Sequence, residues 1–232
     1  MKKSSMHSKM AKYIHPSTIP LEKYDNHVIR GLIQLLPCGI GSAIDVALMK
    51  TLENIQRERT MAFFDELAKG DVIVDEELLK SEDFLHAYFA TTKYALNTRR
   101  REKIEMFARL LKSSLTEEDI SNIDEYEDFL KVLDELSYRE LLALKILDKY
   151  SSTARSEAQK DLKWTNQFWN KFEEDITNEL KIPKDQIASF MDKIARTGCY
   201  EMFTGAYFDY TGGKGKLTPM YQRLKKFIED SE

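Results

Sequence analysis

Cysteine, histidine, proline and glycine are all scarce in this chain of 232 residues, which contains 2 cysteines, 4 histidines, 5 prolines and 9 glycines. Cys38 and Cys199 lie far apart, so we expect no disulfide framework and predict a cytoplasmic location. The histidines are scattered, and neither an HExxH nor a paired CxxC spacing occurs, so we predict no metal and no cofactor. We likewise predict no catalytic residue and no small-molecule substrate, and expect a protein that is not an enzyme.

Long uninterrupted apolar runs are also missing. The lysine- and serine-rich start has no apolar core of the kind found in secretion signals, and we expect residues 1–20 to form a flexible lead-in. The most apolar stretch, residues 32–49, contains Asp45 and is interrupted at Pro37, whereas a spanning helix needs about 20 mainly apolar residues. We therefore expect a buried helical hairpin here, with contact to a membrane as the less favoured alternative.

No sign of charge dominates. The chain has 35 Lys and Arg against 39 Asp and Glu, a net charge of −4, and a polyanion-binding protein would normally be more basic. Hydrophobic residues make up 42% and aromatic residues 11%, which is enough for a folded core. These totals lower the expectation of nucleic-acid binding without removing it.

Apolar residues recur every three or four positions, which predicts a mainly α-helical fold with a helical bundle over residues 21–135. The first two helices, over residues 28–36 and 42–69, are expected to meet at a structural corner. Proline ends the first helix, glycines permit the reversal, and a serine caps the second helix. The corner residues are Pro37, Gly39, Gly41 and Ser42. The inner face of the second helix is predicted to contain Ile44, Leu48, Leu52, Ile55, Ala62, Phe63 and Leu67.

A helix capped by Ser81 should follow, with one apolar face formed by Phe84, Leu85, Tyr88, Phe89 and Ala95. After it comes a basic run of Arg99, Arg100, Arg101 and Lys103. Two interpretations of the run remain open, a polyanion-binding stripe and an ordinary solvated helix face. Cations at a helix start oppose the helix dipole, so we expect a continuous or barely interrupted helix through Asn97, or a start displaced by tertiary contacts.

Residues 136–232 are predicted to form a separate α+β module. A capping box at Ser137 and Glu140 opens its first helix, residues 138–150, and the second helix places aromatic residues at helical spacing. Pro183 opens the third helix. Two strands are expected over residues 199–203 and 207–210, followed by a hairpin-like, glycine-rich tip at residues 211–215, and a closing helix begins near Pro219.

The sequence passages ELKIPKDQIASFMDKIARTGCYE and KLTPMYQRLKKFIED resemble the recognition helix, wing and closing helix of bacterial winged-helix proteins. The resemblance implies a winged-helix-like domain with a wing of two or three strands, although the polar insertion at residues 151–163 departs from the compact pattern. The corner PCGIGS and the passage LSYRELLALKIL resemble uncharacterised bacterial and phage helical proteins of unknown function, which implies no activity.

In winged-helix proteins that bind DNA, the third helix enters the major groove and the wing contacts phosphates. By position, the resemblance assigns nucleic-acid contacts to Lys184, Gln186, Ser189, Lys193, Arg196, Lys214 and Lys216. Asp185 and Asp192 share the helix and would repel phosphate. We therefore expect first an interaction or regulatory protein with a protein partner or self-association, next a DNA-binding transcriptional regulator, and last a membrane-acting effector using residues 28–49.

Overall fold

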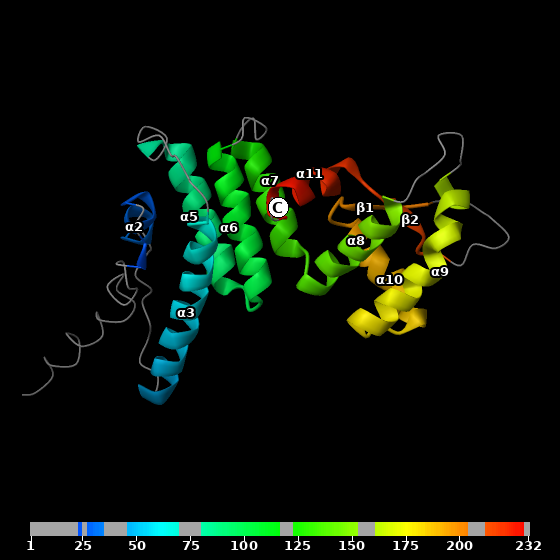
Figure 1. The fold of residues 1–232 in the computed structure, drawn as a ribbon, viewed down its shortest axis with the longest axis horizontal. Helices are drawn as coiled ribbons and strands as arrows, with labels where there is room; N and C mark the ends of the chain where they lie inside the picture. Colours follow the sequence, from blue (N-terminus) through cyan, green and yellow to red (C-terminus); the bar gives the residue numbers. More distant parts are fainter. Residues whose placement is uncertain are drawn as a thin grey trace, which may run out of the picture. The chain divides into compact units, whose positions relative to one another are not determined.

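The computed structural model describes residues 23–24, 27–34, 46–69, 80–116, 123–152, 161–203 and 212–229 (Figure 1). Within these ranges the chain forms nine helices and two short strands, which confirms a mainly helical fold with a small sheet. The elements are α2 (His27–Gln34), α3 (Val46–Leu67), α5 (Glu82–Asn97), α6 (Arg101–Thr116), α7 (Ile123–Glu135), α8 (Tyr138–Ser151), α9 (Asp161–Leu180), α10 (Lys184–Ala195), β1 (Tyr200–Met202), β2 (Gly215–Leu217) and α11 (Pro219–Ile228). The predicted corner at Pro37, Gly39, Gly41 and Ser42 lies outside the described residues.

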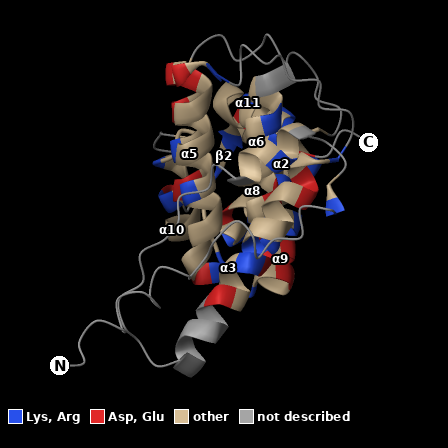
Figure 2. Cartoon of the chain, turned by 90° about the vertical axis from the view of Figure 1, so that its left-hand side faces the viewer, with Lys and Arg blue, Asp and Glu red and all other residues tan. Residues whose placement is uncertain are grey.

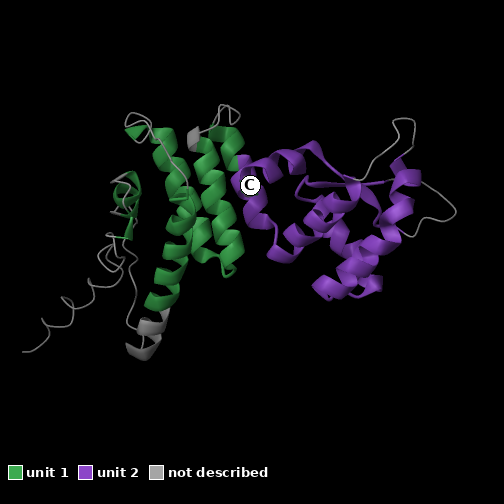
Figure 3. Cartoon of the chain, in the orientation of Figure 1, with its two compact units in different colours: residues 1–127, 228–232 green, residues 128–227 purple. Residues whose placement is uncertain are grey.

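The chain divides into two compact units (Figure 3). Unit 1 comprises Met1–Glu127 together with Ile228–Glu232, and unit 2 comprises Asp128–Phe227. The division therefore falls inside α7, whereas the sequence had suggested a change of module after residue 135.

In unit 1, α6 packs against both α3 and α5, and α2 packs against α3. The apolar residues of α2 are enclosed: Val28 is 8% exposed, Leu32 3%, and Ile29 and Ile33 are fully buried. The first flank of the predicted hairpin thus lies inside the unit. The side chains of α3 before Glu53, which would form the second flank, lie outside the described residues.

Two apolar side chains that periodicity placed inside are in fact exposed. Ile55 on α3 is 37% exposed and Phe89 on α5 is 41% exposed, so the prediction was wrong at both positions. On α5 the buried face consists of Phe84, Ala87, Tyr88, Thr91, Thr92 and Ala95, and Phe89 lies to the side of this face. The remaining predicted face of α5 is confirmed at Phe84, Tyr88 and Ala95, which are buried, and Ser81 Oγ accepts from Phe84 N at 3.2 Å.

A buried ion pair connects α3 to α6. Glu66, 4% exposed, accepts from Arg109 Nε at 2.6 Å, and its second oxygen lies 2.6 Å from Lys69 Nζ. Burial disfavours the charged carboxylate, but the bonds from Lys69 and Arg109 outweigh it and lower the pKa of Glu66 below its ordinary value. Arg109 also donates to the carbonyl of Ile228 at 3.0 Å, which fixes the end of the chain within the same unit.

Unit 2 is built from α8, α9, α10, α11 and the two strands. The predicted capping box is confirmed, because Ser137 Oγ accepts from Glu140 N and Glu140 Oε2 accepts from Ser137 N. The predicted inner face of α9 is confirmed as well. Its buried side chains include Phe168, Trp169, Phe172, Ile176 and Leu180.

The two strands of unit 2 are antiparallel, with Tyr200 opposite Leu217 and Met202 opposite Gly215. The first strand lies within the predicted range. The second strand is formed by residues 215–217, so Gly215 belongs to a strand and not to the predicted tip. The strand predicted at residues 207–210 lies outside the described residues.

We predict that Glu66→Gln lowers the free energy of unfolding of the full chain by about 1–3 kcal/mol at pH 7, because Arg109 loses its buried carboxylate partner. Urea denaturation followed by circular dichroism measures the change. Glu105→Gln is the matched control, since the pair of Glu105 with Arg101 joins side chains 21% and 71% exposed and should contribute less than about 0.5 kcal/mol. Equal losses in the two variants would contradict the prediction.

Candidate functional site

The turn after α9 determines where α10 begins. Lys181, with φ of 55°, adopts the left-handed conformation that commonly ends a helix. Pro183 then occupies the position before the first helical residue, and its carbonyl accepts from Gln186 N at 2.9 Å. The buried side of α10 consists of Ile187, Met191 and Ile194. The opposite side of the helix is therefore presented to solvent.

The side of α10 that faces solvent carries both signs of charge. The five side chains that the resemblance assigned to this helix are all exposed, so the structure brings them together: Lys184, Gln186, Ser189, Lys193 and Arg196. Asp185 and Asp192 are exposed beside them. Figure 2 shows that acidic and basic positions are also interspersed along other helices. No single-sign surface is formed by α10.

Lys193 is engaged in a structural ion pair. Its Nζ lies 2.8 Å from Glu140 Oε1, and Glu140 is only 2% exposed. Burial disfavours the charged form of Glu140, but the bonds from Lys193 and Ser137 prevail and lower its pKa below the ordinary value. Glu140 therefore remains a carboxylate at neutral pH and requires the ammonium of Lys193. The pair fixes α10 to the start of α8.

The lysines of the strand region are paired as well. Lys214 Nζ donates to Asn166 Oδ1 at 2.7 Å. Lys216 Nζ lies 3.1 Å from Asp161 Oδ2 and 3.6 Å from Glu201 Oε2, and the bond to Asp161 raises the pKa of Lys216. The structure thus connects both lysines to groups of unit 2. Lys214 therefore has a neutral amide acceptor, and Lys216 has two carboxylate partners.

Two glycines allow the chain to pass closely over its neighbours. A Cβ on Gly213, whose φ is 82°, would lie 2.7 Å from the Cα of Ala188 on α10. A Cβ on Gly215 would lie 2.5 Å from Cζ of Tyr200. The hydroxyl of Tyr200 donates to the carbonyl of Gly213 at 2.6 Å. The strand pair is therefore held against α10 by close backbone packing.

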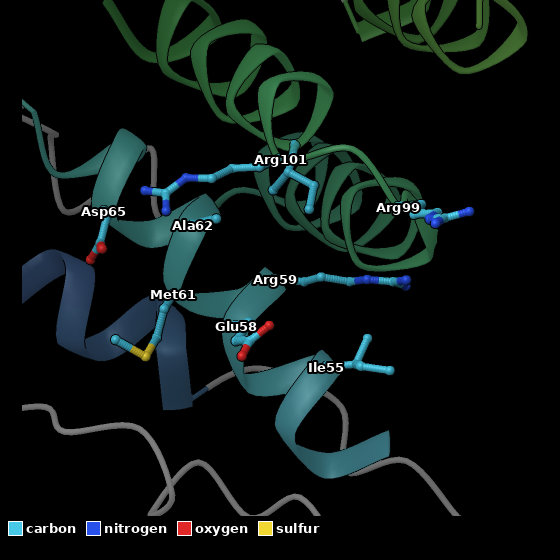
Figure 4. A pocket seen from close by; sticks show the side chains of 9 residues that line it. Ile55, Glu58, Arg59, Met61, Ala62, Asp65, Arg99 and Arg101 are labelled. Carbon is cyan, nitrogen blue, oxygen red and sulfur yellow. The ribbon is translucent and has the colours of Figure 1, made fainter. Parts of the chain in front are cut away.

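Unit 1 contains a separate pocket of about 510 Å³ between α3 and the corner that joins α5 to α6 (Figure 4). Its lining combines arginines, acidic residues and apolar side chains: Ile55, Glu58, Arg59, Met61, Ala62, Asp65, Arg99, Arg101 and Ile104. This pocket was not predicted from the sequence. The run at residues 99–101 was noticed, but the partner residues on α3 lie about forty positions earlier and periodicity had assigned Ile55 to the core.

The basic run at residues 99–103 does not form a stripe. α5 ends at Asn97 and α6 begins at Arg101, so the interruption is short, as expected. Lys103 is 8% exposed and its Nζ lies 5.6 Å from the centre of the Phe107 ring. Arg101 Nε donates to Glu105 Oε1 at 2.9 Å, while Arg99 and Arg101 line the pocket. Lys103 is therefore separated from Arg99 and Arg101, which share the pocket.

Among the described residues, no group of three or more His, Cys, Asp or Glu side chains is arranged to bind a metal ion. Within the same ranges, every helix is too short or too polar to cross a bilayer. Burial raises the pKa of the Cys199 thiol to about 11, so at neutral pH it is protonated.

Comparison with known proteins found no matching family model, and no curated protein or solved structure is detectably similar. The function is therefore inferred from the geometry of this chain.

We predict that Lys193→Ala lowers the free energy of unfolding by about 1–2 kcal/mol at pH 7, because Glu140 keeps a buried charge without its cation. The value is moderate because the Lys193 side chain is 55% exposed and water screens the pair. Urea denaturation measures the change. Lys184→Ala, on the same exposed side, is the control and should stay within about 0.5 kcal/mol of the wild type.

The effect of Lys193→Ala should depend on pH. The pKa of Glu140 is lowered in the folded state, so its contribution is present above the unfolded pKa, about 4.3, and is lost as the pH falls further. The difference between wild type and Lys193→Ala should therefore shrink between pH 7 and pH 3. A difference that is constant over this range would show that Glu140 is not the partner that matters.

Proposed function

We propose that this chain is a non-enzymatic interaction or regulatory protein whose unit 2 is a winged-helix-like module that contacts a protein partner. The order α8, α9, α10, β1, β2 and α11, with the strands antiparallel, supports the resemblance to winged-helix proteins. Cys199 is buried and protonated, which supports the proposal that this residue is not a nucleophile.

The internal pairing of three lysines carries this proposal. Lys193, Lys214 and Lys216 each contact an acidic or amide group of their own unit. To bind a phosphate, each would have to share or give up that contact, and removing Lys193 from Glu140 would leave a buried carboxylate alone. The gain from counterion release, which dominates non-specific DNA binding, would be correspondingly small.

The remaining groups on α10 suit a protein surface. Lys184, Asp185 and Asp192 are exposed on the helix and Arg196 is exposed at its C-cap. A partner with complementary charges of both signs satisfies all four groups, whereas the DNA backbone repels two of them. We therefore place the partner on this side of α10.

Self-association through aromatic helix faces is less well supported. Phe84, Tyr88, Trp169 and Phe172 are buried within their own units, and the exposed aromatic side chain on these helices is Phe89. A membrane-acting role through residues 28–49 is also less well supported, because the apolar side chains of α2 are enclosed. Either role would require these side chains to leave the core first.

DNA binding is retained as the second candidate on one observation. Lys184 and Arg196 are exposed and form no ion pair within the described part of the chain, and Gln186 is also exposed, two positions after Lys184. These are residue types that contact phosphates and base edges.

The two candidates can be separated with the full chain and two matched double variants. Lys184→Glu with Arg196→Glu reverses the charges on α10, and Lys149→Glu with Lys171→Glu makes the same change at exposed positions of α8 and α9. Fluorescence anisotropy with a labelled mixed-sequence duplex at about 50 mM salt measures DNA binding. We expect wild type and both variants to bind with the same weak affinity. A dissociation constant below about 1 µM, lost only in the α10 variant, would establish the DNA-binding alternative.

A photo-crosslinking amino acid at position 186 tests for the protein partner. In cells that naturally produce the chain, we expect one discrete protein adduct. The adduct should disappear when Lys184→Glu and Arg196→Glu are added and persist when Lys149→Glu and Lys171→Glu are added. An adduct that is lost equally in both backgrounds, or no adduct at all, would contradict docking on α10.

A further inference from the structure

The pocket of unit 1 has a chemical character that the proposed function does not use. On α3, Ile55, Arg59 and Ala62 are spaced so that they lie on one side of the helix, and this side forms one wall. Arg99, Arg101 and Ile104, from the corner between α5 and α6, form the other wall. An apolar strip therefore lies next to guanidinium groups contributed by both walls.

The arginines are distributed unequally within the pocket (Figure 4). Arg59 and Arg99 extend to the same side, whereas Arg101 extends toward Asp65. Arg101 is compensated by its bond to Glu105 at 2.9 Å. The positive end of the pocket is consequently formed by Arg59 and Arg99.

The guanidinium of Arg59 is oriented by one hydrogen bond and keeps most of its N–H donors available. Its Nη1 donates to the carbonyl of Leu96 at 2.7 Å, which orients the guanidinium. A guanidinium has five N–H donors, so this bond leaves most of them for another acceptor. The side chain of Arg99 forms no hydrogen bond or ion pair within the described part of the chain. Two guanidinium groups thus lie at one end of the pocket with unused donors.

The start of α6 adds to the positive character. Ile104 N donates to Arg100 O at 3.1 Å, so Arg100 occupies the position before the first helical residue, and an arginine side chain has no acceptor with which to cap the free N–H groups. Arginines at this end also oppose the helix dipole. An anion bound beside Arg99 would reduce both the cost of the uncapped N–H groups and the repulsion between the arginines and the helix dipole.

The acidic lining residues limit how much negative charge the pocket accepts. Asp65 lies 2.6 Å from Lys23 Nζ and accepts from the hydroxyl of Tyr24 at 2.7 Å, so its charge is already compensated. Glu58 also lines the pocket and offsets one of the two arginines at the positive end. A single excess positive charge remains, which favours a monoanion over a phosphate dianion or a polyanion.

The exposed side chain of Ile55 belongs to the apolar part of the pocket. At 37% exposed, Ile55 presents apolar surface to solvent one turn before Arg59, and the lining residues Ala62 and Ile104, which are 6% and 1% exposed, complete the strip below it with little accessible surface of their own. The volume of about 510 Å³ lies within the range of about 300–1,000 Å³ that is typical of small-molecule sites. A ligand with a short hydrocarbon part would cover the strip and remove it from water.

We propose that this pocket binds a small organic monocarboxylate, with its carboxylate held by Arg59 and Arg99 and its apolar part packed on Ile55, Ala62 and Ile104. The planar guanidinium groups match the geometry of a carboxylate, and each can donate two parallel hydrogen bonds to it. The site goes beyond the proposed protein contact on α10, since it lies in the other unit and uses none of the same residues.

Isothermal titration of octanoate into the full chain tests the proposal, with octanol and inorganic phosphate as comparison ligands. We expect octanoate to bind more tightly than either, because octanol lacks the charge and phosphate lacks the apolar part. Arg99→Gln should weaken octanoate binding about tenfold or more, the loss expected for one charge-assisted contact. Ile55→Gln should weaken octanoate binding several-fold, with no change for acetate.

Arg57→Gln is the matched control for Arg99→Gln. Arg57 is an exposed arginine of α3 outside the lining, so its substitution makes the same change in net charge and should leave octanoate affinity unchanged. Urea denaturation confirms that each variant is folded, which is expected because Arg99 and Ile55 are exposed. Equal binding of octanol and octanoate, or equal losses in Arg57→Gln and Arg99→Gln, would overturn the proposal.

Discussion

A carboxylate that is removed from water must keep a cation and hydrogen-bond donors around it, and among the described residues each unit meets that requirement at a junction between two helices. In unit 1, Glu66 joins α3 to α6 through Arg109. In unit 2, Glu140 joins the start of α8 to α10 through Lys193. Apolar burial supplies most of the driving force for folding, but it is non-directional and by itself selects the position of one helix along another only weakly. A buried pair, by contrast, has one favourable arrangement.

Much of the local structure could be read from the sequence because it depends on neighbours in the chain. The capping box at Ser137 and Glu140 needs residues three positions apart, and the buried face of α9 needs only helical spacing. The pairing of Lys193 with Glu140 could not be predicted in this way, because 53 positions separate the two residues. A lysine predicted to be exposed on a helix is equally compatible with contact to solvent and contact to a ligand. Ile55 and Phe89 were misplaced for a related reason. Periodicity shows which side of a helix is apolar, but the partner helix determines how much of it is covered.

The seven side chains assigned to DNA illustrate that exposure at a predicted position does not by itself determine a role. All five on α10 are exposed, as a recognition helix would require, and yet Lys193 contributes to the stability of its own unit. Conversely, the arginine run at residues 99–101 was predicted to lie on a surface. Arg99 and Arg101, at the short interruption between α5 and α6, instead line a pocket together with residues of α3. The role of a charged surface residue can be assigned only when the groups that neutralise its charge are known.

The close passage of Gly213 and Gly215 over α10 and Tyr200 limits how this region can vary over evolutionary time. Even the smallest side chain would collide there, with Ala188 in one case and with the Tyr200 ring in the other. The side chains of Lys214 and Lys216 extend to Asn166 and Asp161, so substitutions at these positions cost those bonds but meet no backbone. Sequence drift over the four consecutive positions 213–216 should therefore exclude any side chain at Gly213 and Gly215 and permit change at the position after each of them.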